Sequence, residues 1–377
     1  MIKRYGEASK MKKRNTLIIV SLLICLTLLA ACNTTATSLQ SNGGEVKGVE
    51  DFTEEVKDKY IISGLDEGLL GLEKIDGSDE KSRDFENRDV DIEFEDIYIN
   101  EVISSDKFFC VQSRREEEDF EAFSIVNQFS QVVGNFSVYA DDVTGVEAVS
   151  VSPSGDIYYV YPDPYIDESY EDETKTYYHL IKKTVEGITV WDVVPGDLDA
   201  DYYSGMVSTD ERTYILNYPI LDIYNNGDGS KEQRLSLSFP CHESDDFDLC
   251  KNDEGELFIV ETFDKNSDEG IPQGYFIGKV ETKTGEVTIA GIGNEHIDCF
   301  ASGHGEFDLY ASNDSSIFGI NLEKKDCKKC IALEEIDEDN YAIQRMQSFS
   351  VIRDDCFLIN YNVDDDQWSS KVRFLKK

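Results

Sequence analysis

The nine residues SPSGDIYYV, at positions 152–160, contain the pattern on which the interpretation of the chain rests. A turn signal, Ser-Pro-Ser-Gly-Asp, directly precedes four strand-forming residues. The same order returns in SSDKFFCV (104–111), STDERTYIL (208–216), NDEGELFIV (252–260), SGHGEFDLY (302–310) and RDDCFLIN (353–360). With Phe108, Ile157, Thr213, Leu257, Phe307 and Cys356 taken as equivalent, the intervals between copies are 49, 56, 44, 50 and 49 residues. Such a period is typical of one four-stranded blade of a β-propeller.

Most copies are followed by a second segment with the order strand, turn, strand. These segments are AFSIVNQFSQVVGNFSVY, YYHLIKKTVEGITVWDVV, LDIYNNGDGSKEQRLSLSF, YFIGKVETKTGEVTIAGI and IFGINLEKKDCKKCIAL. In each copy, the strand that follows the turn is mostly apolar on both faces. Leu257 and Ile259 occupy one face, for example, and Phe258 and Val260 the other. A sheet with one wet face would alternate instead. Strands of this kind need cover on both sides, which radially packed blades provide.

The expected fold is all-β, a β-propeller of about six four-stranded antiparallel blades between residue 89 and residue 377. The last copy stops at SKVRFLKK, its third strand, so we expect DVDIEFED (89–96) to close the ring by pairing there. YIISGLDEGLLGLEKI (60–75) weakly echoes the repeat and leaves a seventh blade open. The stretch SPSGDIYYVY also resembles the Ser-Pro-Asp-Gly turn of WD-type propeller repeats.

The N-terminal segment has the features of an export signal. Six basic residues precede an apolar run from Leu17 to Ala31, which is too short for a comfortable membrane span. The run ends in Leu29-Ala30-Ala31-Cys32, which resembles the bacterial lipobox. That resemblance implies cleavage before Cys32 and attachment of a diacylglyceryl group to its thiol. We therefore expect a signal peptide at 1–31 and a protein held at the cell membrane by this lipid, facing outside the cytoplasm.

Two further segments complete the expected organisation. Residues 32–58 contain few large apolar side chains and predict a disordered, lipid-anchored tether ahead of a propeller domain at 59–377.

Loss of residues 1–31 removes six of 36 basic and one of 77 acidic residues, which leaves a net charge of −46. A surface this acidic repels phosphate backbones, so we expect no nucleic-acid partner.

The cysteines raise the question of a metal or a disulfide. His296 and Cys299, followed by Cys327 and Cys330, have a spacing that zinc ligands use. The blade scheme places Cys299 on an innermost strand and Cys327 in the turn before the outermost one, about 10 Å or more away, so no metal site is expected. Cys241 and Cys250 bracket the segment CHESDDFDLC and are a candidate disulfide outside the cell.

Other candidate sites have simpler explanations. The acidic segments 197–201 and 264–270 lack the glycine that an EF-type calcium loop has at its sixth position. His304 lies in a repeat turn, Ser-Gly-His-Gly-Glu, and we interpret it as a turn residue. No nucleophile motif or phosphate-binding loop is present in the sequence, so no cofactor is expected and enzymatic activity has little support.

These observations favour a non-catalytic binding or scaffolding lipoprotein. Its layout is similar to extracytoplasmic propeller lipoproteins, some of which act beside solute-binding proteins of uptake systems. The expected ligand is a peptide, a glycan or a partner protein. The longest insertion, rich in Tyr and acids, offers Tyr165 and Tyr170 as candidate contacts. The alternative is a surface carbohydrate-active enzyme, because a glycosidase needs only two carboxylates about 5 to 10 Å apart and 77 acidic residues hide such a pair.

The anchoring hypothesis predicts the behaviour of a Cys32→Ala variant. Without the thiol no lipid can be attached, so the variant should be lost from the membrane fraction almost completely. Membrane fractionation followed by immunoblotting measures this. Full retention of the variant on the membrane would contradict the anchor.

Overall fold

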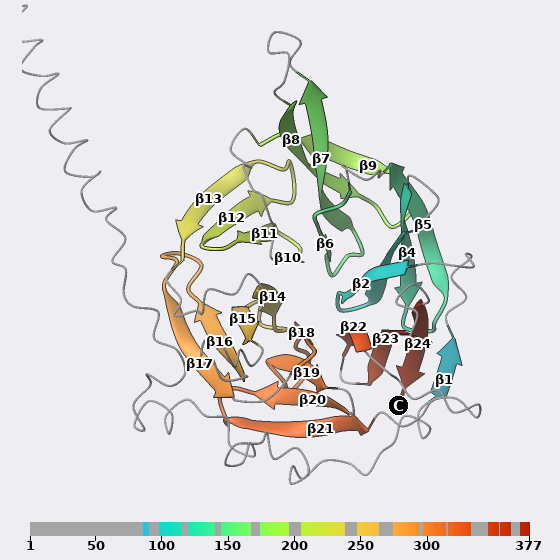
Figure 1. Ribbon diagram of the computed structural model, residues 1–377, viewed down its shortest axis with the longest axis vertical. Coiled ribbons are helices and arrows are strands. Elements are labelled where there is room, and N and C mark those ends of the chain that lie inside the picture. Colours follow the sequence, from blue (N-terminus) through green and yellow to red (C-terminus); the bar gives the residue numbers. More distant parts are fainter. Residues whose placement is uncertain are drawn as a thin grey trace, which may run out of the picture. The chain divides into compact units, whose positions relative to one another are not determined.

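The computed structural model describes residues 86–89, 98–114, 120–139, 145–166, 174–195, 205–237, 247–263, 274–293, 297–313, 316–332, 346–353, 355–362 and 370–377. These residues belong to one compact unit, Gly48–Lys377. They form 24 strands in six four-stranded antiparallel sheets arranged as a ring, so the fold is a six-bladed β-propeller (Figure 1). Within the described residues, no helix is long and apolar enough to cross a membrane.

Each blade runs from an inner strand at the axis to an outer strand. Blade 1 contains β2 (Tyr98–Ser104), β3 (Phe108–Arg114), β4 (Phe120–Asn127) and β5 (Val132–Tyr139). Blade 2 contains β6 (Ala148–Val151), β7 (Ile157–Ile166), β8 (Thr174–Lys183) and β9 (Thr189–Val193). Blade 3 contains β10 (Gly205–Ser208), β11 (Arg212–Asn217), β12 (Ile220–Asn225) and β13 (Lys231–Ser236). Blade 4 contains β14 (Phe247–Lys251), β15 (Leu257–Phe263), β16 (Gly274–Val280) and β17 (Val287–Gly293). Blade 5 contains β18 (Cys299–Ser302), β19 (Leu309–Asn313), β20 (Ser316–Asn321) and β21 (Asp326–Ala332).

Blade 6 joins the two ends of the propeller. It contains β22 (Met346–Ile352), β23 (Cys356–Asn362) and β24 (Ser370–Lys376), and β1 (Glu86–Asp89) pairs with β24 as the fourth, outer strand. Closure by an N-terminal strand is therefore confirmed, but the assigned segment was wrong. The strand is Glu86–Asp89 rather than 89–96, which shares only Asp89 with it. The ring has six blades, and residues 60–75 lie outside the described part of the chain.

Six hydrophobic cores hold the ring together, one between each pair of neighbouring blades. In β15, Leu257 and Ile259 pack toward blade 3, whereas Phe258 and Val260 pack toward blade 5. In β23, Phe357 packs toward blade 5 and Leu358 toward blade 1. The other two cores join blade 1 to blade 2 and blade 2 to blade 3. The apolar side chains on both faces of the second strands thus face two different neighbours, as the sequence predicted.

Two assignments within blade 5 need correction. β19 begins at Leu309, so Phe307 belongs to the preceding turn and is not a strand residue. Its buried ring packs at an edge angle on Tyr310, with ring centroids 5.4 Å apart, and lies under Gly319, where a Cβ would approach the ring to 2.4 Å. Cys327 lies in the outer strand β21 and not in the turn before it.

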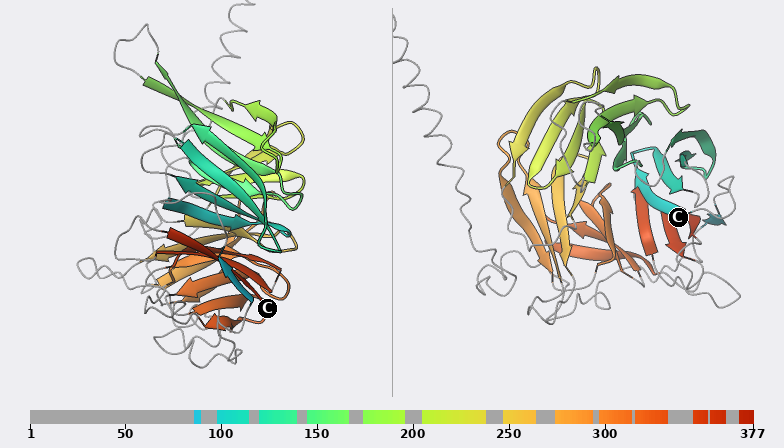
Figure 2. Two further views of the ribbon diagram at one scale, coloured as in Figure 1. Left: turned by 90° about the vertical axis from the view of Figure 1, so that its right-hand side faces the viewer. Right: turned by 45° about the horizontal axis from the view of Figure 1, so that its top comes forward.

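The antiparallel order of the strands gives the ring two different faces. Connections from first to second and from third to fourth strands emerge on one side, here called the turn face, and none is longer than 281–286 or 303–308. Connections from second to third strands and from blade to blade emerge on the other side, the loop face, and include 194–204, 237–246, 264–273 and 333–345. Figure 2 shows the ring from the side, with β7 and β8 extending beyond the neighbouring blades.

Closure by β1 predicts the effect of two deletions. Removing Glu86–Asp89 should lower the Tm by about 5–10 °C, because it leaves β24 as an unpaired edge and opens the joint between the ends of the ring. Thermal unfolding followed by circular dichroism measures this. Deletion of residues 33–55 is the control and should leave the Tm unchanged; equal losses in both variants would argue against closure by β1.

Candidate functional site

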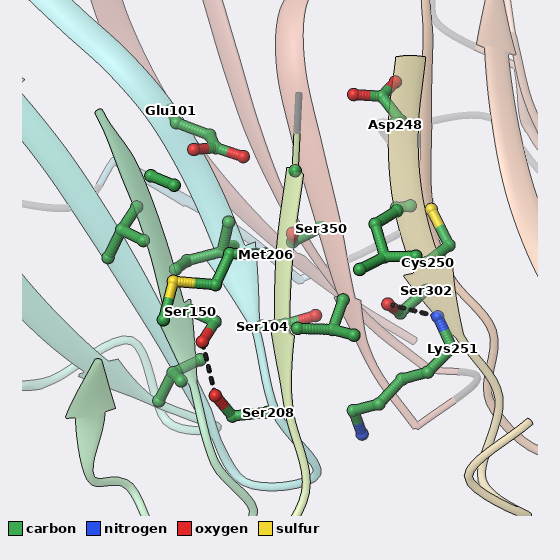
Figure 3. A pocket seen from close by; sticks show the side chains of 18 of the residues that line it. Glu101, Ser104, Ser150, Met206, Ser208, Asp248, Cys250, Lys251, Ser302 and Ser350 are labelled. Atoms are coloured by element: carbon green, nitrogen blue, oxygen red, sulfur yellow. Dashed lines mark hydrogen bonds between the residues drawn. The ribbon is translucent and has the colours of Figure 1, made fainter. Parts of the chain in front are cut away.

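The six inner strands surround a channel along the axis of the propeller. Its cavity measures about 170 Å³ and is lined by residues of β2, β6, β10, β14, β18 and β22. The polar side chains that line the two ends of this channel differ in charge. Figure 3 shows Glu101 and Asp248 at one end, and Lys251, Ser104 and Ser208 toward the other. Because inner strands run from the loop face to the turn face, the acidic end opens toward the loop face.

Three carboxylates gather at the loop-face end: Glu101 on β2, Glu147 just before β6, and Asp248 on β14. All three side chains are accessible to the solvent that enters the channel, although the surrounding strands enclose this space. Burial within the channel and the nearby charge of Asp248 raise the pKa of Glu101 to about 7. Burial also raises the pKa of Glu147. This end of the channel is therefore a site where a positive charge is favoured and where protonation changes near neutral pH.

Hydroxyl groups tie the inner strands to one another. Ser150 Oγ of blade 2 lies 2.5 Å from Ser208 Oγ of blade 3, which in turn lies 2.8 Å from Thr213 Oγ1. Ser350 Oγ of blade 6 donates to the Val102 carbonyl of blade 1 at 2.8 Å. The backbone N–H of Lys251 donates to Ser302 Oγ between blades 4 and 5 at 3.2 Å. These bonds satisfy polar groups where the apolar cores end, and they link neighbouring blades beside the channel.

The turn-face end contains a second charged group of side chains. Lys251 is buried and its Nζ lies 4.0 Å from Asp106 Oδ1, which comes from the turn after β2. His304, in the turn after β18, shares a hydrogen bond of 2.8 Å between its Nδ1 and Asp253 Oδ1. The Gly305 N–H donates to the other Asp253 oxygen, Oδ2, at 2.8 Å. Burial alone would raise the pKa of Asp253, but these hydrogen bonds and the charges of His304 and Lys251 together lower it. Asp253 is therefore ionised.

The predicted ligand contacts lie on the longest hairpin. β7 and β8 contain ten residues each, and their register continues to Ile166 opposite Thr174. The backbone of Tyr165 pairs with Lys175 near the loop-face end of this hairpin. Tyr170 and Cys32 lie outside the described residues. The hairpin extension is thus present in the structure, whereas the contacts of the two tyrosines stay predictions.

The structure does not bring the described cysteines of the proposed zinc spacing together. Cys299 and Cys330 pack on the side of blade 5 that faces blade 6, whereas Cys327 packs on the side that faces blade 4. Burial raises the pKa of the Cys299 and Cys330 thiols to about 12, which disfavours the thiolates that zinc binds. His296 and the acidic segments 197–201 and 264–270 lie outside the described residues.

The disulfide proposed between Cys241 and Cys250 stays a prediction. Cys250 is buried on β14 and lines the channel. Cys241 lies outside the described residues.

Sequence reasoning missed both charged groups of the axis. Glu101, Glu147 and Asp248 had no distinctive local pattern among 77 acidic residues. The turn-face group did carry a signal. Asp106, Asp253 and His304 each stand two residues after the last inner-strand residue of their copy, in S-S-D, K-N-D and S-G-H. Equivalent positions of a propeller converge on the axis, so alignment of the repeat turns could have placed them together.

Comparisons with known proteins support no family assignment. No protein-family model matches the chain, and no curated protein matches it. Among solved structures, a Bacteroides caccae protein of unknown function is similar at 10% identity over 65% of this chain and 80% of its own, with a TM-score of 0.41. A Dyadobacter fermentans protein of unknown function has 8% identity over 77% and 99% of the two chains, with a TM-score of 0.47. The C-terminal WD40 domain of Sif2 has 8% identity over 77% and 98%, with a TM-score of 0.40.

The raised pKa of Glu101 predicts a pH-dependent stability. Its folded pKa of about 7 lies above the ordinary value of 4.5, so the folded state holds a proton that the unfolded state releases between these values. This contribution is complete below about pH 4.5 and is lost as the pH rises through 7. Glu101→Gln should therefore stabilise the protein at pH 8 by about 1 kcal/mol, a value reduced for screening by solvent, and have little effect at pH 4.5.

Urea unfolding at the two pH values measures this difference. Glu254→Gln, at an exposed position on the turn face, is the matched control and should show no such pH dependence. A stabilisation by Glu101→Gln that is equal at both pH values would show that titration of this carboxyl is not its source.

Proposed function

We propose that this protein is a membrane-anchored extracytoplasmic lipoprotein whose β-propeller binds a ligand at its loop face without converting it. The ligand class is a peptide, a glycan or a partner protein. The observation that carries this proposal is the asymmetry of the ring, since the long connections, the β7–β8 hairpin and the acidic end of the channel all belong to the loop face. Binding residues concentrate on loops that a rigid scaffold positions.

The framework beneath this face supports a binding role. Six apolar cores and the hydroxyl contacts between inner strands hold the strand ends in place. A ligand that contacts several blades would therefore lose little free energy in ordering the scaffold, because it is ordered before binding. The carboxylates of Glu101, Glu147 and Asp248 add a preference for ligands that carry a positively charged group near the axis.

The hairpin of β7 and β8 gives this face its largest projecting element. Tyrosine rings stack on sugars and also anchor peptides, so Tyr165 and Tyr170 fit either ligand class. The lipid expected on Cys32 and the segment 32–58 would hold the propeller at the outer side of the membrane. A protein in this place meets envelope components and imported solutes, which matches an accessory role in solute uptake.

A double variant, Tyr165→Ala with Tyr170→Ala, tests the binding surface. It should weaken binding about tenfold or more and change the Tm by less than about 2 °C, since side chains on a projecting hairpin contribute little to the core. Binding is measured with immobilised cell-envelope and dietary glycans and with an array of envelope peptides.

Phe129→Ala is the matched control for this experiment. Its ring is 54% exposed in the connection between β4 and β5, on the turn face, and it should bind every probe as the unchanged protein does. Equal loss of binding in both variants would contradict the loop face as the binding surface. Release of sugar products that disappears on replacing a single carboxylate would instead establish a carbohydrate-active enzyme.

A further inference from the structure

The turn-face group of Asp106, Asp253 and His304 has a geometry that the binding role does not explain. The three residues come from blades 1, 4 and 5, yet one ligand atom of each lies within 4.8 Å of those of the other two. Three ligands placed tetrahedrally about one ion with bonds of about 2.0–2.2 Å lie about 3.3–3.6 Å apart. The ligand atoms must therefore close by at most about 1.5 Å to bring all three onto one ion.

The state of His304 is an independent indication of a ligand. The residue is only 3% exposed, and its Nδ1 is engaged with Asp253. Its Nε2 is also buried and has no hydrogen-bond partner among the residues that the structure describes. Burying an unsatisfied imidazole nitrogen destabilises a fold unless another group completes its contacts.

The donor set indicates the kind of ion. We propose that Asp106, Asp253 and His304 bind a divalent transition-metal ion such as Zn²⁺ and thereby link three blades at the turn face. An imidazole nitrogen with two carboxylate oxygens is a zinc-type set, whereas Ca²⁺ takes oxygen ligands only. Asp106 and Asp253 are 48% and 44% exposed at their side chains, so an ion has a path to the site from solvent.

The ammonium group of Lys251 competes with this ion for the carboxylate of Asp106. Its ammonium lies 4.0 Å from Asp106 Oδ1 and offsets part of the charge of the two carboxylates. A divalent cation that enters must approach this ammonium, and the repulsion lowers its affinity. Replacing Lys251 by Met should therefore strengthen Zn²⁺ binding several-fold, an effect opposite to that expected of a ligand.

Calorimetric titration of the full, detergent-solubilised chain with Zn²⁺ alone tests the site. We expect one high-affinity ion per chain and a rise in Tm of about 5 °C at saturation. Asp106→Asn should weaken this binding at least tenfold; because Asp106 is a half-exposed turn residue, the variant should fold. Asp228→Asn is the matched control, since Asp228 is an exposed residue of the turn face between β12 and β13, the two outer strands of blade 3, and should leave Zn²⁺ binding unchanged.

Two further measurements distinguish this site from other metal-binding groups. His304→Gln should lose the high-affinity Zn²⁺ ion but keep weak Ca²⁺ binding by surface carboxylates. Visible absorption of the Co²⁺ form should lack the thiolate charge-transfer band of a cysteine site. Absence of saturable Zn²⁺ binding, equal affinity in Asp106→Asn and the unchanged protein, or a thiolate band would each overturn the proposal.

Discussion

The ring depends on the alternation of apolar side chains toward two different neighbours. In a strand such as β15, every residue from Leu257 to Val260 is buried, but successive residues enter different cores. A sheet of this kind is stable only if another sheet covers each face, and a closed ring is the arrangement in which every blade has two neighbours. The core between blades 6 and 1 follows from the same requirement, because without it β3 and β23 would each present an apolar face to water.

The same constraint separates the framework from the surfaces that vary. Inner strands converge on the axis, where apolar packing ends and polar side chains take over, so the channel contains hydroxyls, carboxylates and a lysine. Most of this packing comes from the strands, and single connection residues such as Leu237, Ile297 and Phe307 add to it. Short turns suffice where strands simply reverse direction, and long insertions are tolerated at the loop face without cost to the blade cores. Binding specificity can therefore change there while the ring stays the same.

The sequence predicted the repeated element well and its exceptions poorly. Turn signals and doubly apolar strands were sufficient for a ring of about six blades, with a seventh left open, and for the position of most second strands. DVDIEFED is the expected closing strand because it lies just before the first full copy, but an outer strand needs little apolar character, and the polar ENRD at 86–89 takes that place. Alignment with Phe108 and Ile157 of the other copies predicts Phe307 as a strand residue; the space under Gly319 explains its place in the turn. The charged groups of the axis depend on ring closure, which no local pattern encodes.

The distribution of charge along the axis bears on how a ligand meets the channel. Glu101, Glu147 and Asp248 make the loop-face end attractive to a cation, whereas near the turn face the buried ammonium of Lys251 repels a cation and the carboxylates of Asp106 and Asp253 attract one. Low-dielectric walls strengthen both effects, because charges inside a channel are screened less than charges on an open surface. A cationic group that enters from the loop face therefore meets three carboxylates at the mouth before it reaches the ammonium of Lys251. The mouth of the channel is thus suited to holding a positively charged end of a ligand.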